Sequence, residues 1–399
     1  MPDIRIASRP FAEQVAFFRR KVSVPTGGWW DLQRADHAHG FMVAGAFKLD
    51  LLDDLRSIVQ GAIDSGMPLR EFRKAFDEIV TRHGWAYKGG RNWRTRVIYE
   101  TNVRQSYNAG RWQQLTSPAM SAARPYLQYR HNDKGTSRMP RPLHVSWDGL
   151  VLRNDDPWWR THAPMNGWGC KCGIRALSPD DLKALGKDGP DTAPNDGSYA
   201  WTAPDGGQHE VPNGVDPGFD FNAGEEARSL SAARRFGERV MDLPPAWRER
   251  ALEDARRRAD DWHADAGDMI DAMLRGAPRG DAAVGMLLPG TARALEERGL
   301  APTSALMLVR ALDAQALQSV AGESIGFALR DLPARMPQPD VVLLDAIAHE
   351  LVYAWRVEDG YRRARWRMGD GGNVLVGLDT VPASVLRLAS GQLLVGSVP

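Results

Sequence analysis

The sequence is poor in cysteine and contains no long apolar run. Only two of its 399 residues, Cys170 and Cys172, are cysteines. No stretch of about 18 apolar residues is present, so we expect no transmembrane helix. The first residues, MPDIRIASRP, have no apolar core behind their charges, so we expect no secretory signal. We therefore expect a protein that stays in the cytoplasm where it is made, or in a particle assembled there.

The chain also lacks an excess of charge of either sign. Lys and Arg number 51 and Asp and Glu number 50, which leaves a net charge of +1, so total charge indicates no partner. Locally, residues 88–111 hold six basic side chains against the single acid Glu100. Such an excess is typical of a surface for nucleic acid or an acidic protein, but also of an ordinary solvated face. The basic side chains are Lys88, Arg91, Arg94, Arg96, Arg104 and Arg111.

The length of 399 residues predicts two to three domains. Residues 1–44 are expected to form an N-terminal arm. Apolar residues then recur at the helical period over 47–65, 68–83 and 92–115. Gly66 and Gly84 are placed to end the first two of these helices, and Pro68 to start the second. The pattern predicts an α-helical unit.

Beyond Pro118 the pattern changes to short alternating segments. Tyr126–Arg130 and His144–Trp147 alternate polar and apolar residues, which predicts half-buried strands. Ser178 opens a short helix with a capping signature. From 186 to 218, Gly and Pro supply 12 of 33 residues, which favours a linker or a long loop over 186–222.

The rest of the chain divides into two parts. Residues 223–284 are densely charged with a helical period, and we expect two helices separated by Pro244-Pro245. Residues 285–399 show apolar runs separated by Gly and Asp turns and predict a separate α+β domain. The expected fold class is therefore α+β and multi-domain. It has an α-helical N-terminal unit (residues 45–185) that includes a small β/Cys-x-Cys knot, then a linker, charged helices and a C-terminal α+β domain.

Cys170 and Cys172 are the residues with the most specific chemistry. In a reducing cytoplasm so close a pair is typical of a metal clip or of two buried thiols, not of a disulfide. Zinc needs four ligands at tetrahedral angles, and Cys-x-Cys supplies two of them. His144 is the candidate third ligand. The candidate fourth ligands are His162, His131 and Asp148.

Cys170 and His144 also have the residue types of a nucleophilic pair. The surrounding tryptophans are more typical of a packed core than of a substrate channel, so we favour a structural role for this pair over a catalytic one. Two buried thiols in a knotted loop are the favoured interpretation of this pair, and a structural zinc ion is the candidate cofactor. The surrounding tryptophans are Trp147, Trp158, Trp159 and Trp168.

Several rare motifs occur in one order along residues 144–175. They are His144…Trp-Asp-Gly, Asp155-Asp-Pro-Trp-Trp and Pro164-Met-Asn-Gly-Trp-Gly-Cys-Lys-Cys. With Tyr99-Glu-Thr-Asn-Val-Arg and Tyr107-Asn-Ala-Gly-Arg on the preceding helix, they resemble the signature of Mu F-like phage head morphogenesis proteins over residues 45–178. The resemblance implies a minor capsid protein of a tailed phage that binds the portal vertex and aids head assembly, DNA packaging or ejection.

The same resemblance implies the partners and the location. The expected partners are the portal protein and a major capsid or scaffolding protein, with phage DNA as a further candidate through the basic helix 88–111. No membrane is expected. The protein is expected in the virion, at the head interior or portal vertex, and in the host cytoplasm during assembly.

Residues 285–399 are similar in pattern to phage-associated nuclease-like domains of the barnase, EndoU, colicin and RelE group. This similarity implies an alternative, a virion-carried effector with a ribonuclease-like domain that is loaded by the N-terminal module. Ribonucleases without metals need acid–base groups and cations for the phosphate. The candidates are His349, Arg363 and Arg365. A structural module without activity is the favoured interpretation.

Overall fold

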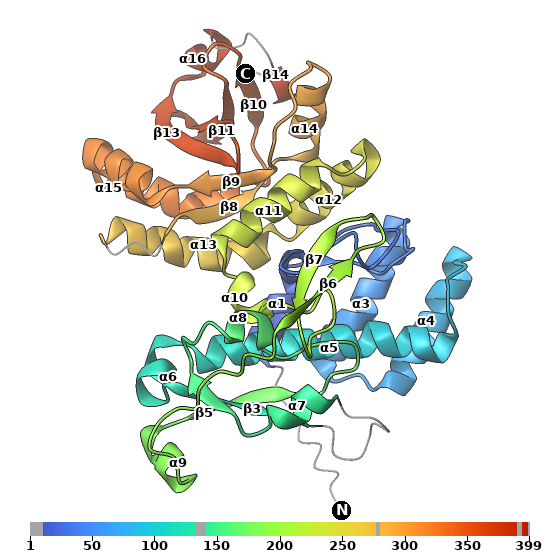
Figure 1. The fold of residues 1–399 in the computed structure, drawn as a ribbon. Helices are drawn as coiled ribbons and strands as arrows, with labels where there is room; N and C mark the ends of the chain where they lie inside the picture. The colour runs from blue at the N-terminus through green and yellow to red at the C-terminus, as the bar shows by residue number, and fades with distance from the viewer. Residues whose placement is uncertain (1–10, 133–140, 277–279, 389–392, 398–399) are drawn as a thin grey trace, which may run out of the picture. The chain divides into compact units, whose positions relative to one another are not determined.

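The computed structural model describes residues 11–132, 141–276, 280–388 and 393–397 (Figure 1). Residues 1–10 of the expected arm lie outside the described residues. The chain forms two compact units. The first extends to Arg228, and the second begins at Ser229 and also includes Val22–Val24. The helices and strands of both units confirm the α+β multi-domain expectation.

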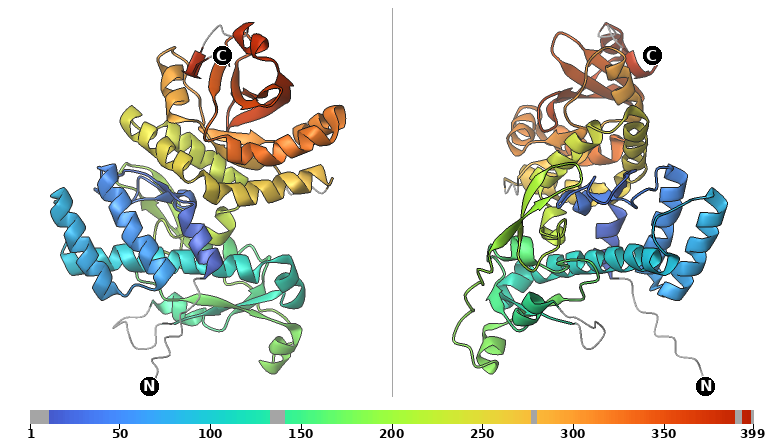
Figure 2. Two further views of the ribbon diagram at one scale, coloured as in Figure 1. Left: turned by 180° about the vertical axis from the view of Figure 1, so that it is seen from behind. Right: turned by 45° about the vertical axis from the view of Figure 1, so that its right-hand side comes forward.

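The first unit is built around one long helix, α5 (Arg91–Leu115). Helices α1, α3 and α4 pack against it, as Figures 1 and 2 show. The other elements of this unit are α1 (Ala12–Arg19), α2 (Asp36–His39), β2 (Gly40–Phe41), α3 (Leu49–Ser65), α4 (Leu69–His83), α6 (Pro118–Ala123), β3 (Tyr126–Arg130), α7 (Pro142–Ser146), β4 (Val151–Arg153), α8 (Trp159–His162), β5 (Gly173–Leu177), α9 (Pro179–Ala184), β6 (Ser198–Thr202), β7 (Gln208–Pro212) and α10 (Ala223–Glu226).

The helix ends follow the local sequence closely. Helices α3 and α4 end at Gly66 and Gly84, whose φ angles of 68° and 57° are left-handed, as is usual where glycine ends a helix. At the crossing of α1 and α5, a Cβ on Gly110 would lie 2.7 Å from the backbone nitrogen of Gln14. Only glycine therefore fits where these helices meet. Ser178 and Asp181 form the expected capping box at the start of α9.

A three-stranded antiparallel sheet, in the order β4-β3-β5, lies beside α5. The expectation of a strand over Tyr126–Arg130 is confirmed. The expectation of a strand over His144–Trp147 is wrong, because Pro142 starts the short helix α7 there. One helical turn brings His144 and Trp147 to the same side, which the four-residue alternation alone did not distinguish from a strand.

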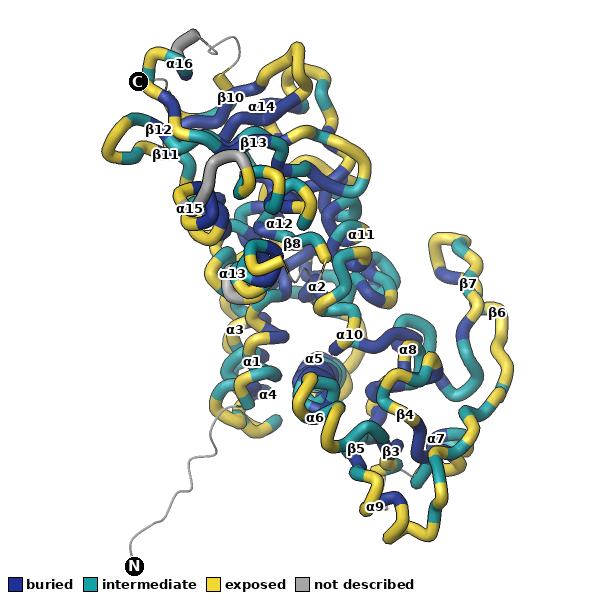
Figure 3. Tube along the Cα trace, turned by 90° about the vertical axis from the view of Figure 1, so that its left-hand side faces the viewer, coloured by how far each residue is buried: buried dark blue, intermediate teal, exposed yellow. Residues whose placement is uncertain are grey.

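The Gly/Pro-rich residues 186–222 contain the β6–β7 hairpin. Strand β6 of this hairpin is largely exposed (Figure 3). They also place Val211, Val215 and Phe219 in the same core as the tryptophans of 147–159. This segment is therefore packed on the first unit along part of its length. Glycine and proline here shape a folded loop.

The second unit contains a seven-stranded sheet in the order β14-β10-β11-β12-β13-β9-β8, in which only β13 and β9 pair in parallel. Helices α13 and α15 lie side by side (Figure 2). The elements of this unit are β1 (Val22–Ser23), α11 (Leu230–Met241), α12 (Pro245–Arg257), α13 (Ala259–Leu274), β8 (Ala282–Met286), α14 (Pro289–Glu296), β9 (Leu306–Val309), α15 (Ala311–Arg335), β10 (Val341–Asp345), β11 (Glu350–Val357), β12 (Gly360–Arg367), β13 (Asn373–Val381), α16 (Ala383–Leu388) and β14 (Leu393–Gly396).

Helices α11 and α12 are separated at Pro244-Pro245, as expected. A further break at Arg258 separates α12 from α13, so the expected pair of helices is in fact a series of three, preceded by the short α10. None of the helices that the structure describes is both long and apolar enough to cross a bilayer.

Candidate functional site

Cys170 and Cys172 lie at the end of a tightly held loop between α8 and β5. Its centre is Asn166, which is completely buried. The Asn166 side-chain nitrogen donates to the carbonyl oxygen of His162 at 2.9 Å, and its oxygen accepts from the Tyr129 hydroxyl at 2.8 Å. The Cys170 N–H closes a turn onto the Gly167 carbonyl at 3.1 Å. These bonds fix the path of the backbone that carries both thiols.

An aspartate from the Gly/Pro-rich segment holds the same loop from outside. One carboxylate oxygen of Asp216 accepts from the Trp168 N–H at 2.9 Å and from the Arg141 guanidinium at 2.6 Å. A Cβ on Gly167 would overlap this pair, since it would lie 1.9 Å from the Arg141 guanidinium. The Asn-Gly part of the motif is thus required by packing.

The side chain of His144, on α7, points at both thiols. Its Nδ1 lies 3.8 Å from the Sγ of Cys170 and 3.6 Å from the Sγ of Cys172. Its Nε2 lies 2.7 Å from the carbonyl oxygen of Gly214, which can only accept a hydrogen bond. In the neutral imidazole, Nε2 is therefore the protonated nitrogen, and Nδ1 presents its lone pair to the sulfurs.

His131 is the candidate fourth ligand that the structure brings to this cluster. It follows β3 directly, and its Nδ1 lies 3.5 Å from the Sγ of Cys172. The Asp148 carboxylate accepts from the His131 backbone N–H at 2.8 Å and so positions this residue. His162 lies elsewhere, because its ring stacks on Trp158 at 4.4 Å and its Nδ1 bonds the Trp158 carbonyl oxygen. The cluster is therefore His131, His144, Cys170 and Cys172.

The two thiols are coupled through one shared hydrogen bond. That bond to Cys172, followed by the contact with His144, lowers the pKa of Cys170. The same bond to Cys170, together with burial, raises the pKa of Cys172. Opposite shifts of the two pKa values are expected when two neighbouring thiols share a hydrogen bond.

Access to this cluster is poor. His144, Cys170 and Cys172 are only 2%, 7% and 5% exposed. The wall around them is aromatic: Trp147 stacks on His144 at 5.2 Å and contacts Trp158 edge-on at 5.4 Å. A thiol nucleophile must reach its substrate, so this geometry favours a structural role over a catalytic one.

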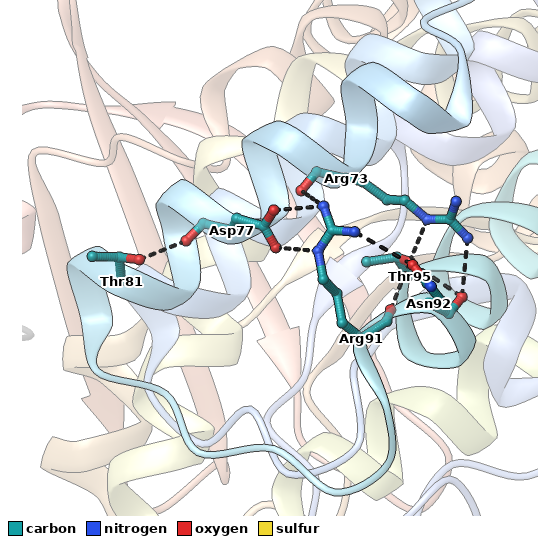
Figure 4. Close-up of polar contacts among 6 residues, drawn as sticks. All are labelled: Arg73, Asp77, Thr81, Arg91, Asn92 and Thr95. Carbon is teal, nitrogen blue, oxygen red and sulfur yellow. Dashed lines mark hydrogen bonds and ion pairs between the residues drawn. The ribbon is translucent and has the colours of Figure 1, made fainter.

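The basic helix α5 uses some of its arginines within the unit. Arg91 forms a two-point ion pair with Asp77 of α4 (Figure 4). The two distances are 2.6 and 2.5 Å. Beside it, Arg73 donates to the hydroxyl of Thr95 at 3.1 Å. Arg94 donates to the Ala44 carbonyl and lies over the Trp85 ring at 5.4 Å. These arginines join α5 to α4 and to the segments that carry Ala44 and Trp85.

Other residues of α5 lie on a side of the helix that is exposed or half-buried. Trp93 and Tyr107 are 57% and 48% exposed. Arg104 and Arg111 follow Trp93 by 11 and 18 residues, about three and five helical turns, so they lie on the same side. Arg96 is exposed near the start of this side. We name Trp93, Arg96, Arg104, Tyr107 and Arg111 the α5 outer face.

Of the three ribonuclease candidates in the second unit, His349 lies apart from Arg363. Arg363 is held by Asp379 at 2.9 and 2.6 Å, and Arg365 contacts Glu350 at 3.4 Å. His349 is exposed at the turn before β11, whereas Arg363 pairs with Ala354, five residues further along that strand. Five strand residues correspond to roughly 17 Å. Both arginines therefore have carboxylate partners, and His349 is remote from Arg363.

Gly214 and Asp216 are site residues that the sequence did not indicate. Gly214 supplies the carbonyl that orients His144, and Asp216 ties down the cysteine loop. Both lie in the segment expected to be a linker. No residue type or spacing connects a backbone carbonyl to a histidine 70 positions earlier, so only the folded chain identifies this contact.

Comparison with known proteins shows that this chain is similar to the Mu F-like class. Residues 53–175 match the family model described as phage Mu protein F like protein. The matched region contains α4, α5 and the whole cysteine–histidine cluster. The resemblance to the Mu F-like family is confirmed.

Two relatives share sequence well beyond that region. The chain is 28% identical to the putative capsid assembly protein F of Escherichia phage Mu, over 97% of this chain and 95% of that protein. It is 29% identical to the Mu-like prophage FluMu F protein of Haemophilus influenzae, over 56% of this chain and 51% of that protein. No solved structure gives a significant match.

Proposed function

We propose that this chain is a minor head protein of a tailed phage, which takes part in head assembly by binding the portal protein. The observation that carries this proposal is the alignment with the putative capsid assembly protein F of phage Mu, which covers 97% of this chain. Both units fall within that alignment. The second unit is thus shared with a head assembly protein over most of its length, which favours a role for both units in the head.

The α5 outer face is the surface we assign to the portal contact. Trp, Tyr and Arg are the residues most enriched at the energetic centres of protein interfaces. Trp93 is 57% exposed, although an indole of this size is usually much more buried in a monomer. The face carries Arg96, Arg104 and Arg111 against Glu100, so it is suited to an acidic surface.

The test is binding of the full chain to the cognate portal protein. Trp93→Ala should weaken the complex by about 2 kcal/mol, which is about 30-fold in Kd, if Trp93 lies at the interface centre. Arg96→Glu should also weaken the complex, and this effect should be larger at low salt than at high salt. The matched controls are Leu185→Ala, an exposed apolar residue away from α5, and Arg70→Glu, the same charge change on exposed α4. Neither control should change the Kd.

Phage DNA is the other candidate for this face. A DNA surface would give three results together. The affinity of the chain for duplex DNA would fall steeply as salt is raised, Arg96→Glu would weaken that binding, and Trp93→Ala would leave portal binding unchanged. If the wild-type chain and the portal protein elute separately at micromolar concentration and low salt, the proposed portal contact is wrong.

The virion-carried effector remains the alternative function. It requires that the second unit be cargo and that the first unit be the loading module. A phage whose chain stops at Arg228 distinguishes the two. Filled heads at normal yield would indicate cargo, whereas empty or unstable heads would indicate that the second unit works in assembly.

A further inference from the structure

We propose that His131, His144, Cys170 and Cys172 bind one zinc ion, which stabilises the cysteine loop against β3 and α7. The set contains two thiolate and two imidazole ligands, a combination that selects zinc in tetrahedral geometry. It is drawn from separate parts of the first unit, so one ion would join segments that lie up to 41 residues apart in the sequence. The proposal is independent of the partner proposed above.

Three distances between the ligand atoms agree with a tetrahedron around one ion. Zn–S bonds of about 2.3 Å and Zn–N bonds of about 2.0–2.1 Å place a sulfur and a nitrogen about 3.6 Å apart. The Nδ1 of His144 lies 3.8 and 3.6 Å from the two sulfurs, and the Nδ1 of His131 lies 3.5 Å from the Sγ of Cys172. All three measured edges agree with the expected edge within about 0.2 Å.

Three corners are in place and the fourth is adjacent. Among the described residues, the ligand atoms of His144, Cys170 and Cys172 lie within 4.8 Å of one another. The Nδ1 of His131 lies close to one member of this group, the Sγ of Cys172. The His131 side chain is half-buried, and we expect it to turn its Nδ1 into the remaining corner when zinc binds. Its backbone stays fixed by the bond to Asp148.

The surroundings of the cluster are those that metal ligands have. A histidine ligand usually donates its other N–H to a carbonyl or carboxylate, which fixes its tautomer, and Gly214 provides this acceptor at 2.7 Å. His144, Cys170 and Cys172 are buried, which indicates a structural ion and not a catalytic one.

The first experiment is elemental analysis of the full chain, purified without chelator and without a histidine tag. We expect about one zinc per chain. Cys170→Ser and Cys172→Ser should lose it, and His131→Ala should hold it more weakly. His162→Ala is the matched control, since His162 is a neighbouring histidine that stacks on Trp158 outside the cluster. It should retain the metal.

A second measurement keeps the proposal testable if the cysteine variants precipitate. The wild-type chain is stripped with chelator and titrated with Co²⁺, whose visible spectrum reports tetrahedral thiolate ligation. We expect a one-to-one endpoint, reversal by Zn²⁺, and a higher melting temperature after reloading. No zinc in the purified chain together with no cobalt–thiolate spectrum would overturn the proposal and leave two buried thiols. Metal retained equally by Cys170→Ser would also overturn it.

Discussion

The Nε2 of His144 lies 2.7 Å from the carbonyl oxygen of Gly214, although the two residues are 70 positions apart. This bond connects the cysteine–histidine cluster to the Gly/Pro-rich segment. Gly214 has a φ of +86°, which disfavours any residue with a Cβ, and it packs against the ring of Trp147. The orientation of His144 therefore depends on a glycine backbone in a loop that the sequence pattern suggested was a linker.

Replacing this glycine should destabilise the first unit. In Gly214→Ala the new Cβ would lie 2.5 Å from the Trp147 ring. Backbone strain costs about 1–3 kcal/mol, and overpacking about 1–3 kcal/mol more. Gly206→Ala is the control, because Gly206 has a similar φ of +91° and no atom within 4 Å of its would-be Cβ. Urea unfolding should show a larger loss for Gly214→Ala, and equal losses would contradict the packing argument.

Lys21 should make stability depend on pH. The residue is 2% exposed, and its ammonium donates to the His37 carbonyl at 2.6 Å. The charge that acts on it is that of Arg56, and among the described residues no carboxylate contributes to its pKa. Burial, and then the charge of Arg56, lowers its pKa from 10.5 to about 7. Between these values the unfolded chain binds the proton that the folded chain does not. The free energy of unfolding should therefore rise with pH across that window, by up to about 1.4 kcal/mol per unit.

The measurement is urea unfolding at several pH values between about 7.5 and 9.5, within the window set by the two pKa values. Lys21→Met should flatten the slope and raise stability at neutral pH, because it removes a buried cation. His37, whose pKa burial lowers to about 4, stays neutral throughout and does not contribute. The control is Lys74→Met on exposed α4, which should keep the wild-type slope. An unchanged slope in Lys21→Met would show that Lys21 is not the titrating group.

The boundary of the second unit gives a prediction about fragments. A fragment of residues 285–399 would lack most of β8 (Ala282–Met286) and all of α11 to α13, which contact β8 in the intact chain. We expect it to expose apolar surface and to bind the dye ANS. A fragment of residues 229–399 retains these elements and should give a cooperative unfolding transition. A well-folded 285–399 fragment would contradict this expectation and support the domain boundary at residue 285 that the sequence predicts.

The sequence predicted the parts of the fold that local patterns encode. Helices α3 and α4 follow from apolar periodicity bounded by Gly66, Pro68 and Gly84. It also predicted β3, but not its partner. Arg130 pairs with Gly173 of β5, and this register brings His131 next to Cys172. The choice of His131 over His162 therefore depends on strand pairing, which is a long-range property that residue spacing does not contain.

The contacts of the two candidate phosphate-binding arginines argue against ribonuclease activity in the second unit. Arg363 and Arg365 lie on one face of β12, as their spacing of two predicts. Both guanidinium groups, however, contact carboxylates: Arg363 contacts Asp379, and Arg365 contacts Glu350, which is 4% exposed. A phosphate would have to displace these carboxylates. We therefore expect expression of the full chain in bacteria to be harmless and cellular RNA to stay intact.

The decisive comparison uses His349→Ala beside the wild type. Loss of a general base costs about 10²–10⁴ in rate, so a real ribonuclease would lose its toxicity in this variant. Arg363→Ala separates catalysis from structure, since it leaves the Asp379 carboxylate without its partner and should lower the melting temperature. If wild-type RNA cleavage is detected and His349→Ala abolishes it at unchanged melting temperature, the second unit is an effector. If RNA stays intact in every variant and only Arg363→Ala melts earlier, these arginines hold the sheet together.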